Sequence, residues 1–275
     1  MAIIFDGKIY SLKKKELLRG GVTLLREKGI IPHLATILIG DDSASKLYVN
    51  LKKKFMEDIG CQVDIYNLNE KTSVFEIDTL INSLNEDKTV HGIMIQFPLP
   101  ESLEPQREKI INLIEKDKDI DGLQLDSKYI HPTAKAVTEI MSLAANEIQR
   151  NERYETATEI HSVCVVGSNG MVGKPLVKEL NRLGYQVTEC DKDTDDLSFK
   201  TVVADCVVSA TGSMNLITSD MVKNDAVIID VGSPMGDVSP EVEEKVSFLT
   251  PVPGGVGPVT ITCLAENLLL AASNS

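Results

Sequence analysis

Residues 165–173 read VVGSNGMVG, and this stretch decides the fold of the second half of the chain. An apolar run suited to a buried strand, residues 162–166, leads into it, and a helical pattern over 174–183 follows. Glycines let a backbone turn sharply and approach a pyrophosphate, which then meets the helix N-terminus. The spacing is G-x-x-G-x-x-G rather than the usual G-x-G-x-x-G, so the strand–turn–helix setting carries the prediction of a dinucleotide loop. The alternative is a tight turn that binds nothing. The three glycines are Gly167, Gly170 and Gly173.

Outward from this loop, the chain repeats one pattern, a short apolar run next to an amphipathic helix. Continuous apolar strands flanked by helices predict parallel sheets that are covered on both faces, an α/β fold. Asp42 or Ser43 is expected to cap the second helix. The expected strands are 33–40, 61–66, 92–95, 162–166, 185–190, 206–209 and 226–231, and the expected helices are 9–29, 43–60, 74–86, 174–183 and 260–272.

The pattern predicts two domains, for which 275 residues are sufficient. Residues 1–140 are expected to form an N-terminal three-layer α/β domain, and residues 260–275 to pack back on it as a C-terminal helix. Residues 141–259 are expected to form a Rossmann-like dinucleotide-binding domain. The polar stretch around residues 144–160 is interpreted as the connection between them.

The composition excludes several classes of protein. There are 28 Lys and Arg residues against 41 Asp and Glu residues, a net charge of −13, which argues against a nucleic-acid partner. The N-terminus has no signal pattern and no run of about 18 residues is wholly apolar, so we expect no membrane partner and a cytoplasmic protein. The five cysteines form no CxxC pair, which favours buried free thiols over a zinc site or a disulfide framework. No metal site is predicted.

Asp191 follows the second strand of the predicted dinucleotide unit, eighteen residues after Gly173. A carboxylate there can accept the ribose hydroxyls of NAD and repel the 2′-phosphate of NADP. Lys192 would act in the opposite sense, but the surrounding residues are acidic. The alternative is a solvated acidic turn.

Polar residues in the first half lie where a parallel sheet binds ligands. Gln96 follows the strand 92–95, at its carboxyl end. Tyr48 and Lys52 are four apart on one helix and share a face, although most such pairs are surface pairs. Asp121 lies in the turn 118–122, which is otherwise an ordinary charged turn. The segment TPVPGGVGPVT, residues 250–260, has three prolines and three glycines, which specify a rigid backbone.

Together and in this order, these motifs resemble the methylenetetrahydrofolate dehydrogenase/methenyltetrahydrofolate cyclohydrolase family, over nearly the whole chain. The specific stretches are Asn85-x-Asp87 with the run 93–99, where Phe97 replaces a usual Leu, and the run 253–258. The resemblance implies oxidation of 5,10-methylenetetrahydrofolate with NAD(P) and hydrolysis of the methenyl product to 10-formyltetrahydrofolate. It also implies a homodimer formed through the cofactor-binding domain.

The resemblance implies a role for each matched residue. Lys52 would be the catalytic lysine of hydrolysis, Gln96 would position it, Tyr48 would pack on the pterin, and Asp121 would bind the pterin amino and N–H groups. The implied substrate contacts are Tyr48, Lys52, Gln96, Pro98, Leu99, Asp121, Pro253, Gly254, Gly255 and Pro258. The implied cofactor contacts are Gly167, Ser168, Asn169, Gly170, Val172, Gly173, Asp191, Lys192, Thr211, Gly212 and Ser233.

The sequence departs from the family at two places. Ser168 stands where the family usually has Arg, and Asp191 where it usually has His, so NAD is expected as the preferred cofactor with NADP as the alternative. The family usually has Pro-Cys-Thr-Pro-x-Gly at residues 131–136. Of these six residues, only Thr133 and the following Lys135 match the family. The alternatives are a monofunctional NAD-dependent dehydrogenase, a catalytically idle Rossmann protein and a non-folate dehydrogenase.

Overall fold

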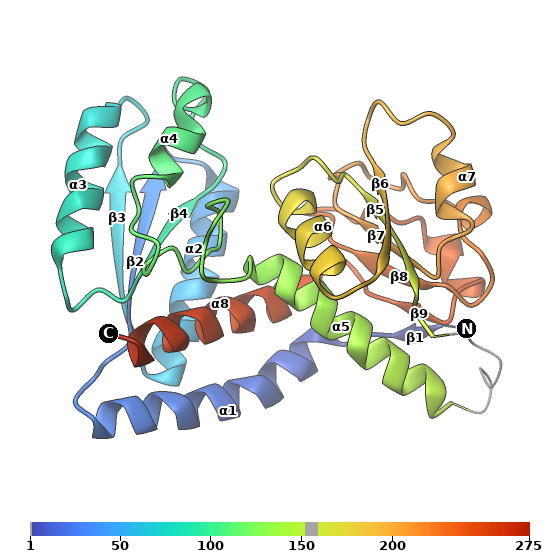
Figure 1. Ribbon diagram of the computed structural model, residues 1–275, viewed down its shortest axis with the longest axis horizontal. Coiled ribbons are helices and arrows are strands. Elements are labelled where there is room, and N and C mark those ends of the chain that lie inside the picture. Colours follow the sequence, from blue (N-terminus) through green and yellow to red (C-terminus); the bar gives the residue numbers. More distant parts are fainter. Residues whose placement is uncertain (1, 152–158) are drawn as a thin grey trace. The chain divides into compact units, whose positions relative to one another are not determined.

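The computed structural model describes residues 2–151 and 159–275, which divide into two compact units (Figure 1). Unit 1 contains the residues up to Leu12 together with Thr133–Thr260. Unit 2 contains Lys13–Pro132 and Ile261–Ser275. The C-terminal segment therefore returns to the unit formed by the first half of the chain, as the sequence predicted.

Unit 2 is built on a parallel sheet of three strands in the order β3-β2-β4. Asp42 caps α2, because its side chain accepts a hydrogen bond of 2.7 Å from the backbone N–H of Ser45. The predicted strands and helices of this unit are all present, with ends shifted by a few residues. The bounds are β2 His33–Ile39, α2 Ser43–Ile59, β3 Gln62–Leu68, α3 Val74–Glu86, β4 Gly92–Gln96 and α4 Arg107–Ile111.

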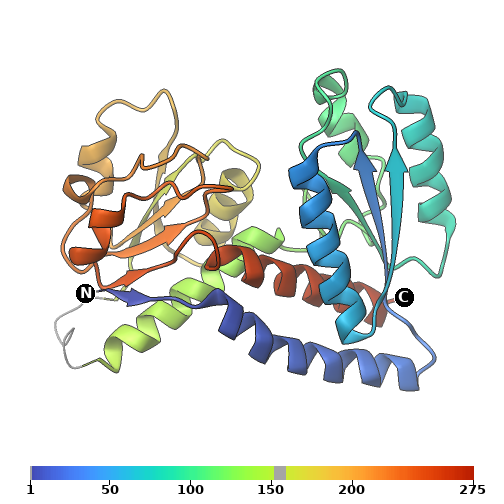
Figure 2. The ribbon, with the colours of Figure 1, turned by 180° about the vertical axis from the view of Figure 1, so that it is seen from behind.

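Helices cover both faces of this sheet, which gives the predicted three layers. On one face, side chains such as Leu34 and Met94 pack with α2, with α1 (Gly7–Glu27) and with α8 (Val256–Ser273). On the other face, Ile37 and Ile95 pack with α3 and α4. Within this unit α1 and α8 lie side by side (Figure 2), and Lys14 forms an ion pair of 2.8 Å with Glu266.

Helix α8 is long and apolar by composition, with 18 residues and a mean hydropathy of 1.4, which is enough to cross a membrane on those criteria alone. Its apolar side chains have a different use here. Leu264, Ala265 and Leu268 are buried in the core of unit 2, against Leu18 and Val22 of α1. Packing in this core explains the hydropathy of the helix.

Unit 1 is built on a six-stranded parallel sheet in the order β1-β9-β8-β7-β5-β6. The order reverses between β5 and β7, the topological switch point at which such sheets bind ligands. The strands are β1 Ile3–Ile4, β5 Ser162–Val166, β6 Gln186–Cys190, β7 Cys206–Ser209, β8 Val227–Asp230 and β9 Phe248–Leu249, and the named helices are α5 Pro132–Gln149, α6 Gly173–Arg182 and α7 Leu197–Thr201.

Two sequence expectations differ from this structure. The first residues of the chain, expected in the N-terminal domain, group with unit 1, because β1 pairs with β9, and residues 133–140 of the expected N-terminal domain also belong to unit 1. The connection expected over 144–160 is helical as far as Gln149, because α5 buries Ala144 and Ile148 on an apolar face. The later residues 152–158 of that stretch lie outside the described residues. All five cysteines are buried free thiols, as predicted.

Candidate active site

Lys52 lies on α2 beside the carboxyl end of β4 in unit 2. Its Nζ donates a hydrogen bond of 3.1 Å to Oε1 of Gln96, the last residue of β4. The same ammonium lies 3.3 Å from the Sδ of Met94. Gln96 is oriented in turn, because its Nε2 donates to the carbonyl of Phe97 at 2.7 Å. The Lys52 side chain is thus held at the end of a parallel strand, where such sheets bind ligands.

Asp121 lies in a turn whose neighbours are tied down by hydrogen bonds. The buried carboxylate of Asp119 accepts from the backbone N–H groups of Leu123 and Gln124, at 3.3 and 3.1 Å. Asn267 of α8 donates from Nδ2 to the carbonyl of Ile120 at 2.8 Å and to that of Ile130 at 2.9 Å. The turn that carries Asp121 is therefore positioned by the C-terminal helix.

Lys52 interacts electrostatically with Asp121 and with His131. Burial lowers the pKa of the Lys52 ammonium, and the negative charge of Asp121 opposes that shift. Burial raises the pKa of the Asp121 carboxyl, and the positive charge of Lys52 opposes it. Burial and the charge of Lys52 together lower the pKa of His131 to about 4. The site thus favours neutral forms of all three groups relative to water.

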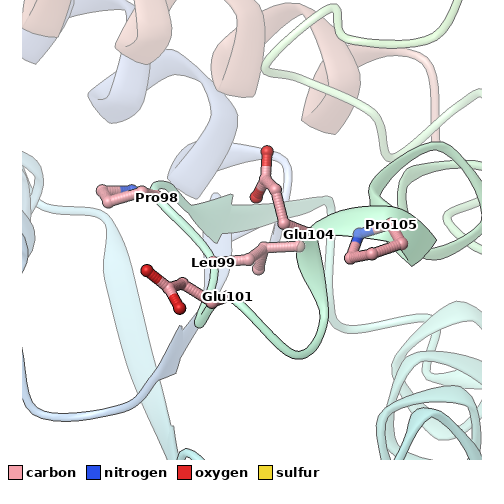
Figure 3. Close-up of a pocket in the computed structure, with 5 residues that line it drawn as sticks. All are labelled: Pro98, Leu99, Glu101, Glu104 and Pro105. Atoms are coloured by element: carbon pink, nitrogen blue, oxygen red, sulfur yellow. The ribbon is translucent and has the colours of Figure 1, made fainter.

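The remaining residues expected at the substrate site differ in exposure. Tyr48 is 39% exposed on α2, one turn before Lys52, whereas Leu99 is 6% exposed and belongs to the core. Figure 3 shows a pocket in the segment after β4, which is lined by Pro98, Leu99, Glu101, Glu104 and Pro105. Glu104 forms an ion pair with Arg107. Two carboxylates in its wall make this pocket unfavourable for an anionic group.

The glycine loop of unit 1 follows β5 and leads into α6, as predicted. Gly167 has a φ of +88°, and its N–H donates to the carbonyl of Cys190 at 2.8 Å. A Cβ placed on Gly173 would lie 2.0 Å from the carbonyl oxygen of Gly167. Only glycines allow this close approach of the backbone to itself, and the loop lies at the switch point of the sheet. These features fit a dinucleotide.

Asp191 directly follows β6 and is held close to the glycine loop. Asn169 of the loop donates a hydrogen bond from Nδ2 to the Asp191 carboxylate. The other carboxylate oxygen accepts from the backbone N–H of Asp193 at 3.0 Å. Lys192 is exposed, whereas Ser168 is 3% exposed. Of the expected cofactor contacts, Asn169 and Asp191 are therefore brought together.

The loops after β7 and β8 are linked by a buried carboxylate that sequence reasoning missed. Asp237 accepts hydrogen bonds from the backbone N–H and the hydroxyl of Thr211, at 2.8 and 2.9 Å, and from the hydroxyl of Ser209 at 2.8 Å. Asp230 accepts from the N–H groups of Gly232 and Asp237. This network positions Thr211, with Gly212 next to it, on one loop, while Ser233 lies exposed on the other.

The proline- and glycine-rich loop belongs to unit 1, in which it follows β9 and leads into the first turn of α8. Its backbone is closely packed, because a Cβ on Gly255 would lie 2.6 Å from the carbonyl oxygen of Pro251. A Cβ on Gly7 would lie 1.9 Å from the carbonyl oxygen of Gly255, which explains the glycine at the start of α1. Pro253 and Gly254 lie in the loop before α8 begins, and Pro258 lies in α8.

Two family models match this chain. The model of the tetrahydrofolate dehydrogenase/cyclohydrolase catalytic domain matches residues 5–121, and that of the NAD(P)-binding domain of the same family matches residues 132–275. The chain belongs to the tetrahydrofolate dehydrogenase/cyclohydrolase family. The resemblance seen in the motifs is thereby confirmed. Unit 1 contains most of the residues that match the NAD(P)-binding domain, and residues 261–275 of that match lie in unit 2.

Relatives match over almost the full length. The bifunctional protein FolD of Campylobacter jejuni strain RM1221 is 39% identical, with 98% of each chain covered, and that of Methanosarcina barkeri is 40% identical, with 99% of this chain and 96% of the relative covered. The crystal structure of the Campylobacter jejuni bifunctional enzyme superposes with a TM-score of 0.89 at 37% identity, covering 100% and 99% of the chains. The Trypanosoma brucei enzyme, complexed with NADP and an inhibitor, gives 0.88 at 28% identity, covering 99% and 98%.

Sequence reasoning missed three residues of the unit 2 site, namely Met94, His131 and Asn267. Met94 belongs to an apolar strand, and nothing in the sequence distinguishes it from a core residue. His131 appeared only as a departure from the family pattern. Asn267 had one signal, a polar side chain within a mostly apolar helix, and it is 3% exposed.

Proposed function

We propose that this chain oxidises 5,10-methylenetetrahydrofolate with a nicotinamide dinucleotide and hydrolyses the methenyl product to 10-formyltetrahydrofolate. One observation supports the hydrolytic half most directly. A desolvated lysine, Lys52, is hydrogen-bonded to Gln96 and electrostatically coupled to Asp121 at the carboxyl end of a parallel sheet. The full-length relatives named as bifunctional support both halves.

In the hydrolytic step, water attacks the cationic methenyl carbon. A C–O bond forms, and one water proton moves to the Lys52 amine. The C–N bond then breaks as the remaining O–H group becomes the formyl C=O, and the proton that it releases is taken up by the departing nitrogen. A lowered lysine pKa favours the neutral amine that accepts the first proton, and the Gln96 hydrogen bond limits the directions in which the amine points. Asp121 would bind the pterin amino and N–H groups.

For the oxidation, the residues of the glycine loop would hold the dinucleotide. The backbone of 167–173 would accommodate the pyrophosphate, and α6 would direct its N-terminus toward it. Thr211, Gly212 and Ser233 would line the same side of the sheet, after β7 and β8. When bound, the nicotinamide supplies an acceptor for the hydride of the methylene carbon.

We infer that the preferred cofactor is NAD. A carboxylate at Asp191 repels a 2′-phosphate, and the adjacent loop positions carry neutral Ser168 and Asn169. The Asn169–Asp191 hydrogen bond supports this inference, because it keeps the carboxylate beside the loop. The NADP bound by the Trypanosoma brucei relative shows that other members accept the phosphate. Comparing kcat/KM for NAD and NADP with methylenetetrahydrofolate tests the inference, and a clear NADP preference would overturn it.

A pair of variants sharpens the cofactor test. Replacing the carboxylate in Asp191→Ser removes the repulsion, so the ratio of kcat/KM for NAD to that for NADP falls by roughly tenfold or more. Asp193→Ser removes an exposed charge two residues away and keeps the ratio. If both variants shift the ratio equally, the general acidity of this turn, rather than Asp191, governs the preference.

The hydrolytic activity is tested by the absorbance of the methenyl compound. The enzyme should remove added methenyltetrahydrofolate faster than buffer does. If the compound accumulates during oxidation and decays only at the buffer rate, the chain is a monofunctional dehydrogenase. If neither activity appears, the proposed function is wrong.

We also propose a homodimer formed through unit 1. Its helix α7 carries Phe199, which is 73% exposed, and Val203, which is 62% exposed, follows one turn later. Two exposed large apolar side chains so close in the chain, the second just beyond the end of α7, favour a covered surface. Light scattering measures the mass in solution, and a mass of one chain at working concentration would refute the dimer.

The five buried free thiols favour a reducing compartment, so we propose that the protein works in the cytoplasm. Fractionation of cells with an antibody against the protein tests this proposal. Recovery in an oxidising compartment would contradict it.

A further inference from the structure

The loop after β7, residues 210–217, is held at both of its ends by Asp237. At its start, the Asp237 carboxylate accepts hydrogen bonds from the backbone N–H and the hydroxyl of Thr211, at 2.8 and 2.9 Å. That hydroxyl accepts in turn from the N–H of Ser213 at 3.1 Å. At its end, the backbone carbonyl of Asp237 accepts from the N–H of Ile217 at 2.9 Å. The side chain of Asp237 therefore holds the Thr211 end, and its backbone holds the other.

Asp237 is itself fixed by the loop after β8. It is fully buried, and its N–H donates a hydrogen bond of 3.1 Å to the carboxylate of Asp230, the last residue of β8. The same carboxylate accepts from the N–H of Val238 at 3.0 Å. A Cβ on Gly236 would lie 2.7 Å from it, so the backbone packs closely around this group. The acceptor that Thr211 meets is therefore in place without any ligand.

The Thr211 end of the loop packs directly on the glycine loop. A Cβ on Gly167 would lie 2.6 Å from the carbonyl oxygen of Ala210 and 3.3 Å from the methyl carbon of Thr211. These two loops follow β5 and β7, the strands between which the order of the sheet reverses. Ligands of such sheets bind outside the carboxyl ends of the strands at that point. A shift of Thr211 would therefore change the space between the two loops where the dinucleotide is expected.

We propose that Asp237 is a positioning residue for the dinucleotide, which acts by holding Thr211 against the glycine loop. The inference rests on the proposed function. Because the carboxylate is fully buried, it acts through Thr211 and not by contact with the ligand. A loop that is already ordered loses less conformational entropy when a ligand binds, which strengthens binding. Without the carboxylate, the dinucleotide would have to order the Thr211 end as it binds, so the effect falls on affinity rather than on hydride transfer.

The decisive comparison uses Asp237→Ala and Asp237→Asn. Alanine removes the acceptor of both bonds to Thr211. Asparagine keeps one side-chain oxygen for these donors and places its nitrogen at the position of Oδ1, which accepts no hydrogen bond within the described part of the chain. We expect the Kd for NAD, measured by titration calorimetry, to rise by about tenfold or more in Asp237→Ala and to stay within about threefold of the parent in Asp237→Asn. The kcat of oxidation at saturating NAD should change by less than about threefold in both variants.

Hydrolysis of added methenyl compound separates this role from a loss of folding. That reaction needs no dinucleotide and is assigned to side chains of unit 2, so it should persist in Asp237→Ala. Ser209→Ala is a matched variant of the same network, since it removes the bond of 2.8 Å from β7 to the carboxylate and keeps both bonds to Thr211. It should lower the thermal stability and raise the Kd for NAD by less than about twofold. Asp220→Ala removes an exposed carboxylate of unit 1 and should change neither value.

Two results would overturn the role of Asp237. One is a parent-like Kd for NAD in folded Asp237→Ala. The other is an Asp237→Asn variant that binds as weakly as Asp237→Ala, because the negative charge and not the held loop would then govern binding. If Asp237→Ala does not fold, Thr211→Val replaces it, since valine keeps the shape and removes the hydroxyl bond; the Kd should rise about threefold or more, and a parent-like Kd would overturn the role.

Each of these results leaves the proposed function intact when the parent enzyme oxidises methylenetetrahydrofolate. A parent enzyme that binds neither NAD nor NADP would refute the proposed oxidation itself.

Discussion

The side-chain oxygen of Gln96 accepts a hydrogen bond of 3.1 Å from the ammonium of Lys52. The amide cannot turn freely, because its nitrogen donates to the carbonyl of Phe97 at 2.7 Å. These two hydrogen bonds connect the lysine of α2 to the backbone at the end of β4. The Lys52 side chain has four rotatable bonds, but it points in one direction because the Gln96 amide that it contacts is itself held by the backbone.

Replacing this lysine should separate binding from hydrolysis. In Lys52→Met the apolar stem remains and the proton acceptor is lost, so hydrolysis falls by about a hundredfold or more. The KM for the methenyl compound should change little, and decay of its absorbance measures both quantities. Lys46→Met is the control on the same helix, because Lys46 is exposed and pairs with Asp41. Unchanged hydrolysis in Lys52→Met would refute the role of the lysine.

Asn267 should matter for folate binding although it lies on the C-terminal helix. Asn267→Ala leaves the carbonyls of Ile120 and Ile130 without their donor, which costs about 1–3 kcal/mol per buried group. The Asp121 turn loses its anchor, so the KM for methylenetetrahydrofolate should rise. The urea concentration at the midpoint of unfolding should fall. Asn146→Ala removes an exposed amide of α5 and should change neither value. An Asn267→Ala variant with normal stability would contradict this account.

Acid should destabilise the protein through His131. Its pKa is about 4 in the folded chain against an ordinary 6.5, so between these values the unfolded chain binds more protons. Stability is therefore lost as the pH falls from 6.5 to 4, by up to about 3 kcal/mol. The raised pKa of Asp121 acts in the opposite sense, because its folded form takes up a proton more readily.

Urea unfolding at pH 7 and pH 4.5 for the parent and for His131→Asn isolates the histidine contribution, since Asp121 and Lys52 are common to both. The parent should lose more stability between the two pH values than the variant does. Equal losses would mean that His131 titrates in the folded protein as it does in the unfolded chain.

A methyl group at Gly173 should disrupt the glycine loop. In Gly173→Ala the new Cβ meets the carbonyl oxygen of Gly167 at 2.0 Å, so the loop or α6 must move. We expect destabilisation by about 1–3 kcal/mol and weaker dinucleotide binding, measured by titration calorimetry. Gly20→Ala is the control, because nothing lies within 4 Å of that position in α1, and it should stabilise the chain by about 0.5–1 kcal/mol. Parent-like dinucleotide affinity in Gly173→Ala would contradict the packing argument.

Local patterns in the sequence were sufficient to predict most of the architecture. The apolar run 33–40 and the cap at Asp42 predicted β2 and α2, because strand burial and helix capping depend on neighbours in sequence. The strands β1 and β9 escaped prediction, because two residues carry no period and each strand exists only by pairing with distant backbone. The helical part of the expected connection was missed because its polar side chains mask the buried Ala144 and Ile148.

The candidate site, like the fold, could be predicted from the sequence only in part. The sequence by itself was sufficient to predict the family, the glycine loop and the candidate residues Lys52, Gln96 and Asp121, because each lies in a short motif that resembles the family's. Only the tertiary structure decided that Lys52 is desolvated and directed by Gln96, that Asn267 anchors the Asp121 turn from the far end of the chain, and that His131 is buried beside them. Burial and electrostatic coupling depend on which groups share a volume, and sequence spacing does not record that for residues far apart along the chain.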